Sequence, residues 1–214
     1  METFAVEGLP EIREGDDLAG LVEERVDLED GDVLCVASTV VSKAEGRKAD
    51  LSAFPASERA ESIADRLESV TGDSKDPRFA QAVLEESEEL LTEAPFLLAV
   101  TRFGHVTVNA GIDRSNVPGA DLLLLPESPT DSAARLSSAL SVPVVVTDTS
   151  GRPFRYGQRG VAVGWSGLPA ARDWRGESDR DGRELGVTVQ AVVDELAAAA
   201  NLVAGEGGGG TPAV

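Results

Sequence analysis

The chain has very few cysteines, histidines and aromatic residues. Cys35 is the only cysteine, which excludes an intramolecular disulfide and a CxxC motif. His105 is the only histidine, which excludes metal sites built from several histidines and leaves one imidazole to activate a serine or cysteine nucleophile. Any metal would therefore be bound mainly by Asp, Glu, Thr and carbonyl oxygens, which suit Mg²⁺ or Mn²⁺ better than Zn²⁺ or copper.

Lysine is also scarce, and acidic residues are in large excess. Lysine occurs only at Lys43, Lys48 and Lys75, and the formal net charge of the 214 residues is -19. Disorder does not account for this acidity, because 42% of the residues are hydrophobic and fall in periodic runs. The alternatives are an acidic partner-binding surface and a protein that works in concentrated salt, and the even spread of the acids favours the second. The negative field would repel nucleic acids.

No apolar run approaches the length of a membrane span, and no signal peptide precedes the acidic N-terminal sequence. We therefore expect a soluble, cytoplasmic protein without a membrane partner. Cys35 lies in the apolar run Val33–Val36, which predicts a small buried core residue.

Hydrophobic periodicity predicts an α/β or α+β fold of helices and strands, and the length of 214 residues suits one large domain or two small ones. One predicted helix carries Phe79, Val83, Leu84, Leu90 and Leu91 on its apolar face, and Thr130 is a candidate N-cap. Residues 170–186 are predicted to form a long loop. Strands are predicted at 4–6, 32–38, 96–100, 106–108, 122–125, 142–147 and 161–163, and further helices at 16–26, 55–70 and 188–203.

Two stretches, 103–116 and 146–155, each begin as an apolar run and continue into a polar turn. Asp113 and Asp148 are each predicted to end a strand there. A local Asx-turn explains either aspartate alone. Taken together with Asn116 and Thr149, they are candidates for a shared divalent-cation or phosphate site, provided that the fold brings the two turns together.

A second group of polar residues follows the predicted strand at 32–38. Ser38 and Thr39 offer hydroxyl groups and Lys43 a cation, a combination that suits phosphate recognition, although a lysine after a strand is most often a surface charge. Neither a GxxxxGK[ST] loop nor a GxGxxG dinucleotide motif is present.

Glycine is concentrated near the C-terminus, in the segment 205–214. The glycines at 207–210 could let backbone amides surround a phosphate, but composition alone favours a flexible tail. Arg152, Arg155 and Arg159 are candidates for an anion clamp, or for surface partners of the many acids.

The ordered motifs together resemble the coenzyme F420-0:L-glutamate ligase (F420 gamma-glutamyl ligase) family, over almost the whole chain. The most specific segments are Ala37–Gly46, Phe103–Pro118, Asp148–Arg155, Asp173–Gly176 and Gly205–Glu206. The resemblance implies a single domain over 1–214 with a two-lobed α/β fold and mixed sheets, which forms an intertwined homodimer. The acidic composition suggests a version from a halophilic archaeon.

The resemblance also implies a reaction. GTP would phosphorylate the terminal carboxylate of coenzyme F420-0, and the amine of L-glutamate would attack the resulting acyl phosphate. A second glutamate would then be added through its gamma-carboxylate. The protein would thus be a GTP-dependent acid–amino-acid ligase that uses Mn²⁺ or Mg²⁺ at two sites, with K⁺ as a stimulating ion.

The resemblance assigns roles to individual residues. Asp113 and Asp148 would bind one metal ion, and Thr149 and Glu206 a second. Arg152 and Arg155 are candidates for substrate binding. The implied contacts of GTP are Leu9, Pro10, Glu11, Ile12, Ser38, Thr39, Lys43, Asn116, Ala204, Gly205, Glu206, Gly207, Gly208, Gly209, Gly210 and Thr211.

Two other hypotheses remain. In a metal-dependent phosphatase, Asp113 and Asp148 would activate water, and GTP would release phosphate without a co-substrate. A non-catalytic GTP-binding module would bind the nucleotide without turnover.

Overall fold

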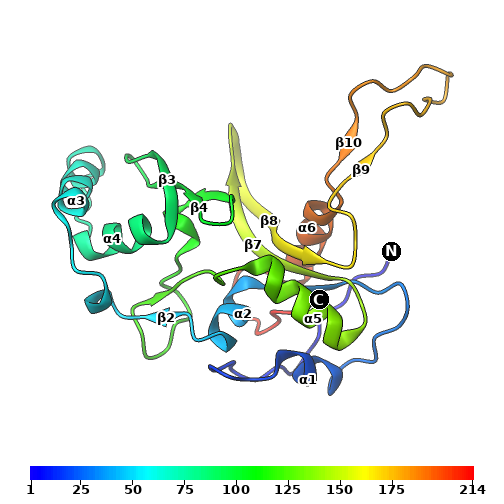
Figure 1. Ribbon diagram of the computed structural model, residues 1–214, viewed down its shortest axis with the longest axis horizontal. Coiled ribbons are helices and arrows are strands. Elements are labelled where there is room, and N and C mark those ends of the chain that lie inside the picture. The colour runs from blue at the N-terminus through cyan, green and yellow to red at the C-terminus, as the bar shows by residue number, and fades with distance from the viewer. The chain divides into compact units, whose positions relative to one another are not determined.

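The computed structural model describes all residues, 1–214, and shows a mixed α/β protein (Figure 1). It contains six α-helices and ten strands, which form four small sheets, so the predicted α/β (α+β) class is confirmed. The backbone divides into two compact units, which we describe separately. The first unit consists of Met1–Glu11, Asp17–Val41 and Pro129–Val214, and the second of Ile12–Asp16 and Ser42–Ser128.

The first unit is built on a three-stranded sheet with the strand order β1-β7-β8. β1 (Leu34–Ala37) runs parallel to β7 (Val144–Arg152), and β7 forms a long antiparallel hairpin with β8 (Arg155–Ser166). The first three residues of both β1 and β7 are buried without polar alternation, which is typical of strands covered on both faces.

The C-terminal residues complete this sheet on the free side of β1. The backbone N–H groups of Cys35 and Ala37 donate to the carbonyls of Val214 and Pro212, each at 2.8 Å, and Val36 pairs with Ala213 in an antiparallel bridge. β1 therefore has hydrogen-bonded neighbours on both edges. The prediction of a flexible tail is wrong for these last residues.

Helices cover both faces of the sheet. In Figure 1, α5 (Pro129–Leu140) lies in front of the β7–β8 hairpin and α6 (Val192–Ala204) lies behind it. Two glycines of β8 permit this close approach. A Cβ atom on Gly160 would lie 2.3 Å from the Ala197 carbonyl oxygen of α6, and one on Gly164 would lie 2.3 Å from the Pro129 carbonyl carbon of α5. The short helix α1 (Leu18–Glu23) also belongs to this unit.

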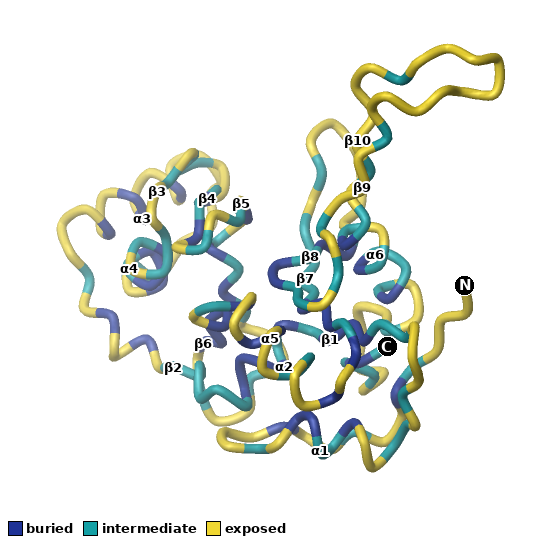
Figure 2. Tube along the Cα trace, turned by 45° about the vertical axis from the view of Figure 1, so that its right-hand side comes forward, coloured by how far each residue is buried: buried dark blue, intermediate teal, exposed yellow.

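Residues between β8 and α6 form an extended arm with two short strands at its base, and the rest of the arm is the long loop that the composition predicts. β9 (Arg172–Asp173) pairs with β10 (Val189–Gln190), and the arm extends from them with nearly all of its residues exposed (Figure 2). Two contacts stiffen its base. The Trp174 indole N–H donates to Gln190 at 3.1 Å, and hydrogen bonds from the Arg175 guanidinium hold the pKa of Asp173 below its ordinary value.

The second unit contains the antiparallel sheet β3 (Ser87–Thr92), β4 (Leu98–Thr101) and β5 (Val106–Val108). α3 (Glu58–Thr71) and α4 (Pro77–Glu85) contribute Ile63, Leu67, Phe79 and Val83 to the buried core of this unit, which also contains Leu97 of the connection to β4. The remaining elements are α2 (Ser38–Ala44), which begins in the first unit and ends in the second, the strand pair β2 (Lys48–Ala49) and β6 (Leu122–Leu123), and the 3-10 helices Leu51–Ala53 and Asn109–Gly111.

A largely buried carboxylate ties three segments of the second unit together. Glu86, whose side chain is 13% exposed, accepts hydrogen bonds from Arg47 at 2.7 Å and from Arg102 at 3.0 Å. The Arg47 guanidinium also donates to the Leu125 carbonyl at 2.9 Å. The group is internally satisfied, so it holds the segments together rather than offering a free charge.

The predicted helix that carries Phe79, Val83, Leu84, Leu90 and Leu91 is too long. It ends at Glu85, and the residues after it form β3, with Leu90 paired to Ala99 of β4. Leu90 and Leu91 are therefore strand residues. Their helical spacing from Leu84 is accidental, because pairing with β4 satisfies the backbone that a longer helix would have used.

Two further predictions are wrong, one for residues 4–6 and one for the start of α5. Residues 4–6 form no strand, although the Val6 N–H donates to the Ala213 carbonyl at 2.9 Å. Thr130 is not an N-cap, because α5 begins one residue earlier, at Pro129, where the fixed φ of proline suits the first turn. None of the helices combines the length and the apolar character that a membrane crossing requires.

We predict that Gly164→Ala destabilises the protein, because the added methyl group would overlap the backbone of α5, which cannot move without disturbing the core. Overpacking of this kind costs about 1–3 kcal/mol, or a decrease of several degrees in the melting temperature of a chain of this size. Gly186→Ala is the matched control, since nothing lies within 4 Å of a Cβ atom there. Equal melting temperatures for the two variants by differential scanning calorimetry would contradict the proposed close packing.

Candidate functional site

Thr149 and Glu206, which are 57 residues apart, lie together in the first unit. The Thr149 hydroxyl donates to the Glu206 carboxylate at 3.2 Å from Oε1 and 3.4 Å from Oε2. The Asn201 side-chain amide of α6 donates to the same Oε1 at 2.8 Å, which gives the carboxylate a second fixed partner. The structure thus joins two of the predicted metal ligands and adds Asn201, which the sequence patterns did not single out.

The approach of α6 to β7 depends on a residue across the hairpin. Gly160 pairs directly with Thr149, and a Cβ atom on Gly160 would lie 2.9 Å from the Asn201 Cβ. A glycine at this position therefore lets the end of α6 come close enough to the hairpin for Glu206 to reach Thr149. No sequence pattern reveals this, because the glycine matters only for contact between elements.

The spacing of the two oxygens fits a divalent cation. In an octahedral Mg²⁺ site with metal–oxygen distances of about 2.1 Å, neighbouring ligand oxygens are about 3.0 Å apart. The Thr149 Oγ1–Glu206 Oε1 separation of 3.2 Å is close to this value, so the pair can occupy adjacent positions around one ion. Within neither unit do three or more His, Cys, Asp or Glu side chains come together in a way that could hold a metal ion, so water or phosphate oxygens would have to complete the shell.

Asp148 does not end a strand, contrary to the prediction. β7 continues to Arg152, and Asp148 is paired with Val161 inside the hairpin. The polar residues after Thr147 remain extended because β8 supplies cross-strand hydrogen bonds that local turn propensity cannot outweigh. The Asp148 Oδ1 accepts a hydrogen bond from the Thr149 backbone N–H at 2.8 Å.

Asp113 lies in the second unit and forms a local turn. An Asx-turn was the alternative to a metal-binding role for this aspartate. Its Oδ1 accepts hydrogen bonds from the Ser115 backbone N–H at 2.7 Å and from the Ser115 hydroxyl at 2.8 Å. Its backbone pairs with Leu123 in an isolated bridge, so it follows β5 at a distance instead of ending it. Asp113 and Asp148 belong to different units, and their shared metal ion stays a prediction.

The backbone before Asp113 is unusual. Asn109, Ala110 and Gly111 have φ values of 57°, 54° and 71°, and Asn116 has a φ of 54°. Left-handed conformations are rare for residues other than glycine, and they concentrate at functional sites. Asn109, Ala110 and Asn116 are the residues of the second unit, other than glycine, that have a positive φ.

The glycine-rich segment is a closed loop, not a free tail. The Thr211 hydroxyl donates to the Ala204 carbonyl at 3.0 Å, and Gly205 caps α6 with a φ of 70°. A Cβ atom on Gly207 or Gly208 would meet nothing within 4 Å, so the backbone there is open. The loop therefore presents exposed amides next to Glu206.

The other predicted GTP contacts differ in exposure. Leu9 is half-buried and Pro10 and Glu11 are exposed, but Ile12 is 1% exposed and belongs to the core. Lys43 is 7% exposed, so the alternative that it is an ordinary surface charge is wrong. Ser38 is buried at the first turn of α2, Thr39 is half-buried beside it, and Asn116 lies in an exposed bend of the second unit.

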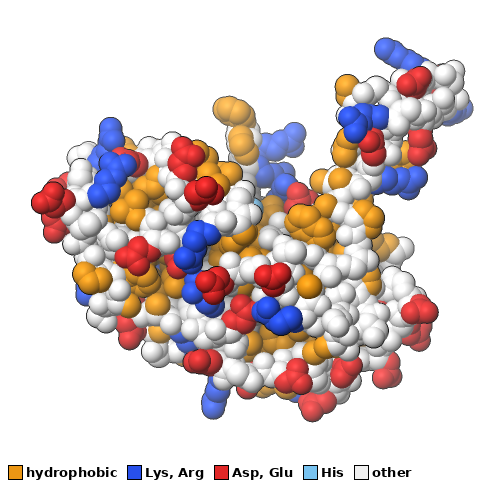
Figure 3. Space-filling model, viewed as in Figure 1, with side chains coloured by type: hydrophobic (Ala, Val, Ile, Leu, Met, Phe, Trp, Pro, Cys, Tyr) orange, Lys and Arg blue, Asp and Glu red, His pale blue; other side chains and the backbone are white.

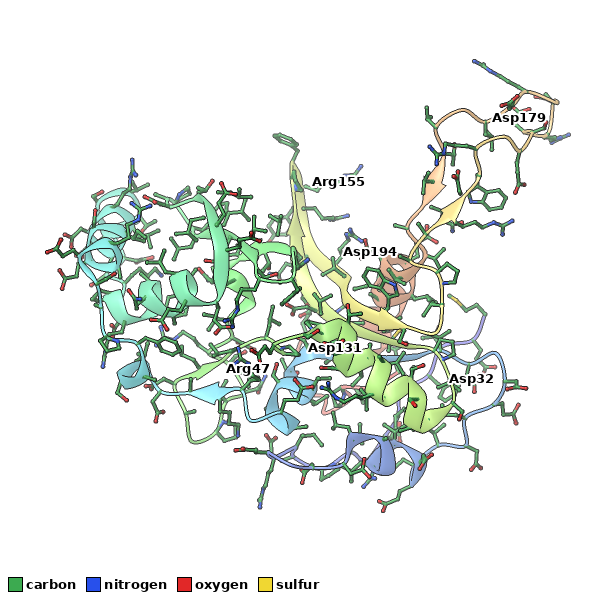
Figure 4. The ribbon with its side chains drawn as sticks, viewed as in Figure 1. Asp32, Arg47, Asp131, Arg155, Asp179 and Asp194 are labelled. Carbon is green, nitrogen blue, oxygen red and sulfur yellow. The ribbon has the colours of Figure 1, made fainter.

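The candidate substrate-binding arginines lie at the tip of the β7–β8 hairpin. Arg152 pairs with Arg155 across the turn, and its guanidinium donates to the Tyr156 carbonyl at 3.1 Å. Figure 4 shows Arg155 at this tip. Arg159 lies 3.9 Å from Asp194, a long ion pair.

Comparison with known proteins identifies the family. The profile of the F420-0:Gamma-glutamyl ligase family matches residues 8–214. The chain belongs to this family. A coenzyme F420:L-glutamate ligase from Natronomonas pharaonis is 83% identical over 214 residues, which are all of this chain and 85% of that relative. Relatives with the same name from Halorubrum lacusprofundi and Archaeoglobus fulgidus are 73% and 55% identical, and the match covers all of this chain and 86% of each.

Family membership confirms the resemblance seen in the sequence motifs. The similarity to ligases from halophilic archaea also agrees with the explanation of the acidic composition as an adaptation to concentrated salt. Such a ligase needs no protein nucleophile if a phosphorylated carboxylate is the electrophile.

The only cysteine is not a suitable nucleophile. Cys35 lies in β1 and is packed against Val145 and Val193, and burial raises the pKa of its thiol to about 12. At pH 8 the thiolate fraction would be about one in ten thousand.

We predict that iodoacetamide at pH 8 leaves Cys35 of the folded protein unmodified, because the thiol is both buried and protonated. The same reagent should alkylate Cys35 fully in denaturant, as measured by intact-protein mass spectrometry. Rapid modification of the folded protein would show that β1 is accessible and that Cys35 is a reactive group.

Proposed function

We propose that the protein is a GTP-dependent ligase that adds L-glutamate to coenzyme F420-0. The terminal carboxylate of coenzyme F420-0 attacks the γ-phosphorus of GTP, which gives an acyl phosphate and GDP. The glutamate amine then attacks the acyl carbon, phosphate leaves with the bonding electrons, and the amine loses a proton as the amide forms. A second glutamate is added to the product through its gamma-carboxylate by the same steps.

The observation that carries this proposal is the Thr149–Glu206 pair beside the open glycine loop, in a chain that belongs to this family. Phosphoryl transfer depends on positioning and charge neutralisation more than on a protein nucleophile. Backbone amides of Gly207 and Gly208 can donate to phosphate oxygens, and the hydroxyl and carboxylate can bind the cation that accompanies them.

In this proposal Thr149 and Glu206 hold one Mn²⁺ or Mg²⁺ ion, and Asp113 and Asp148 hold a second, with K⁺ as a stimulating ion. Bound divalent ions neutralise the charge that develops on the transferred phosphoryl group. Asn201 positions the Glu206 carboxylate, and the Ser115 hydrogen bonds orient Asp113. Each carboxylate is thus directed before the nucleotide arrives.

The nucleotide site would also draw on the start of α2 and on the N-terminal segment 9–12. The Ser38 and Thr39 hydroxyls and the Lys43 ammonium are suited to phosphate oxygens. The protein would act as a homodimer, as the family resemblance implies. Arg152 and Arg155 would pair with anionic groups of the substrate.

Incubation with GTP, Mn²⁺, L-glutamate and coenzyme F420-0 in high salt tests the function. Mass spectrometry should detect products heavier by one and then two glutamate residues. Phosphate release from GTP without either co-substrate would support a phosphatase instead. GTP binding by calorimetry without any product would indicate a non-catalytic nucleotide-binding module.

We predict that Glu206→Gln lowers kcat/KM for ligation by at least about 100-fold, because it removes an anionic metal ligand. The concentration of Mn²⁺ needed for half-maximal activity should rise as well. The melting temperature should change little, since Glu206 is exposed. Glu23→Gln is the matched control, because Glu23 is an exposed carboxylate at the end of α1. Wild-type activity in Glu206→Gln would exclude Glu206 as a ligand.

A further inference from the structure

The β7–β8 hairpin lies in a stretch of unusual composition. Residues 149–172 contain no Asp or Glu, although the chain has 38 acidic residues in 214, and they contain four arginines. A protein this acidic repels anions over most of its surface. An acid-free, arginine-bearing projection is therefore a place where an anionic ligand is attracted instead of repelled.

Two aromatic side chains at the hairpin tip are fully exposed. Phe154 and Tyr156 have relative exposures of 107% and 103%, and Tyr156 is the only tyrosine of the chain. Aromatic residues are only 4% of the composition, so exposure of two of them at one tip is not a general feature of this surface. In Figure 3, hydrophobic and basic side chains meet at this projection.

The turn itself favours a different residue at position 154. Pro153 and Phe154 form the two-residue connection between β7 and β8, and Phe154 has a φ of 58°. A proline followed by a residue of positive φ is the arrangement of a type II turn, in which glycine is strongly preferred at the second position. A bulky aromatic residue there disfavours the turn, so folding alone does not explain it.

The arginines at the tip have few competing partners. The Arg155 side chain makes no hydrogen bond or ion pair, and the Arg159 side chain has only the long contact with Asp194. The Arg152 Nε is buried and lacks a hydrogen-bond partner. Guanidinium groups with unused donors are suited to phosphodiester or carboxylate oxygens.

Thr149, which contacts Glu206, lies on β7, the strand that leads to the tip. Phe154 follows Thr149 by five residues, which is roughly 16 Å in extended backbone. A ligand with an aromatic ring at one end and a reacting carboxylate at the other could therefore reach from the tip to the phosphate-binding end of the hairpin. The separation also keeps the ring away from the reacting groups.

We infer that the hairpin tip binds the ring end of the anionic acceptor substrate. Phe154 and Tyr156 stack on the planar deazaflavin ring, and Arg155 and Arg159 pair with the phosphodiester that follows it. This inference rests on the proposed function, since coenzyme F420-0 supplies both the ring and the anion. The two aromatic side chains select a substrate with a large planar group and make no contact with GTP.

The test measures coenzyme F420-0 binding by quenching of deazaflavin fluorescence, and separately the KM of each substrate. Phe154→Gly and Tyr156→Ala should each weaken F420-0 binding roughly tenfold, the effect expected for loss of one stacking partner. The KM for GTP should stay within twofold of wild type. Arg155→Gln should also lower the affinity for F420-0. This loss of affinity should become smaller as the salt concentration rises, because salt screens exposed charges.

Three variants separate binding from folding. Phe154→Gly should melt at the wild-type temperature or above, since glycine accepts the positive φ. Tyr156→Phe should bind F420-0 like the wild type because it keeps the ring. Phe4→Ala is the control for loss of an exposed phenylalanine elsewhere, and it should leave F420-0 binding unchanged.

The outcomes distinguish this inference from the proposed function. Weaker binding of F420-0 by the tip variants, in a protein that forms no glutamate adduct, would support the inference and overturn the ligase. Normal ligation with unchanged F420-0 affinity in the tip variants would support the ligase and overturn the inference. A change in molar mass by light scattering with unchanged F420-0 affinity would assign the tip to contact with a second copy and would overturn the inference, as would absence of F420-0 binding by the wild type.

Discussion

The first unit depends on the hydrogen bonding of β1 along both of its edges. β7 pairs with one edge in parallel, and residues 212–214 pair with the other, so two segments that are distant in sequence are held by one short buried strand. This arrangement positions the start of α2 directly after β1, fixes the long hairpin that bears Asp148 and Thr149, and closes the loop that bears Glu206. The positions of Asp148, Thr149, Glu206 and the start of α2 therefore all depend on β1.

The sequence predicted the fold class and the buried strands well, because their apolar runs are long and uninterrupted. It failed where pairing between elements overrides local pattern. Leu90 and Leu91 continue a helical spacing but pair with β4, and the polar residues around Thr149 look like a turn but form a hairpin with β8. The sequence of each segment gives no indication of the strand that pairs with it.

The residues of the candidate site also differ in whether the sequence alone could indicate them. Asp113, Asp148 and Thr149 were recognisable because they lie in polar segments that follow apolar runs, whereas Glu206 entered only through the family resemblance. Asn201 and Gly160 were not recognisable, since an asparagine in an alanine-rich helix and a glycine in a strand carry no signal of their own. Their importance arises only when α6 lies against the hairpin, so it becomes visible only in three dimensions.

The closed glycine loop has a consequence for how the chain tolerates changes in length. Both ends of the loop are fixed, one by the end of α6 and the other by residues 212–214, which pair with β1. Glu206 follows α6 after a single residue, whereas several glycines separate it from residues 212–214. An insertion before Glu206 would shift its carboxylate away from Thr149, while one among the later glycines would only enlarge the open part of the loop. The length of the chain is therefore more tightly constrained before Glu206 than after it.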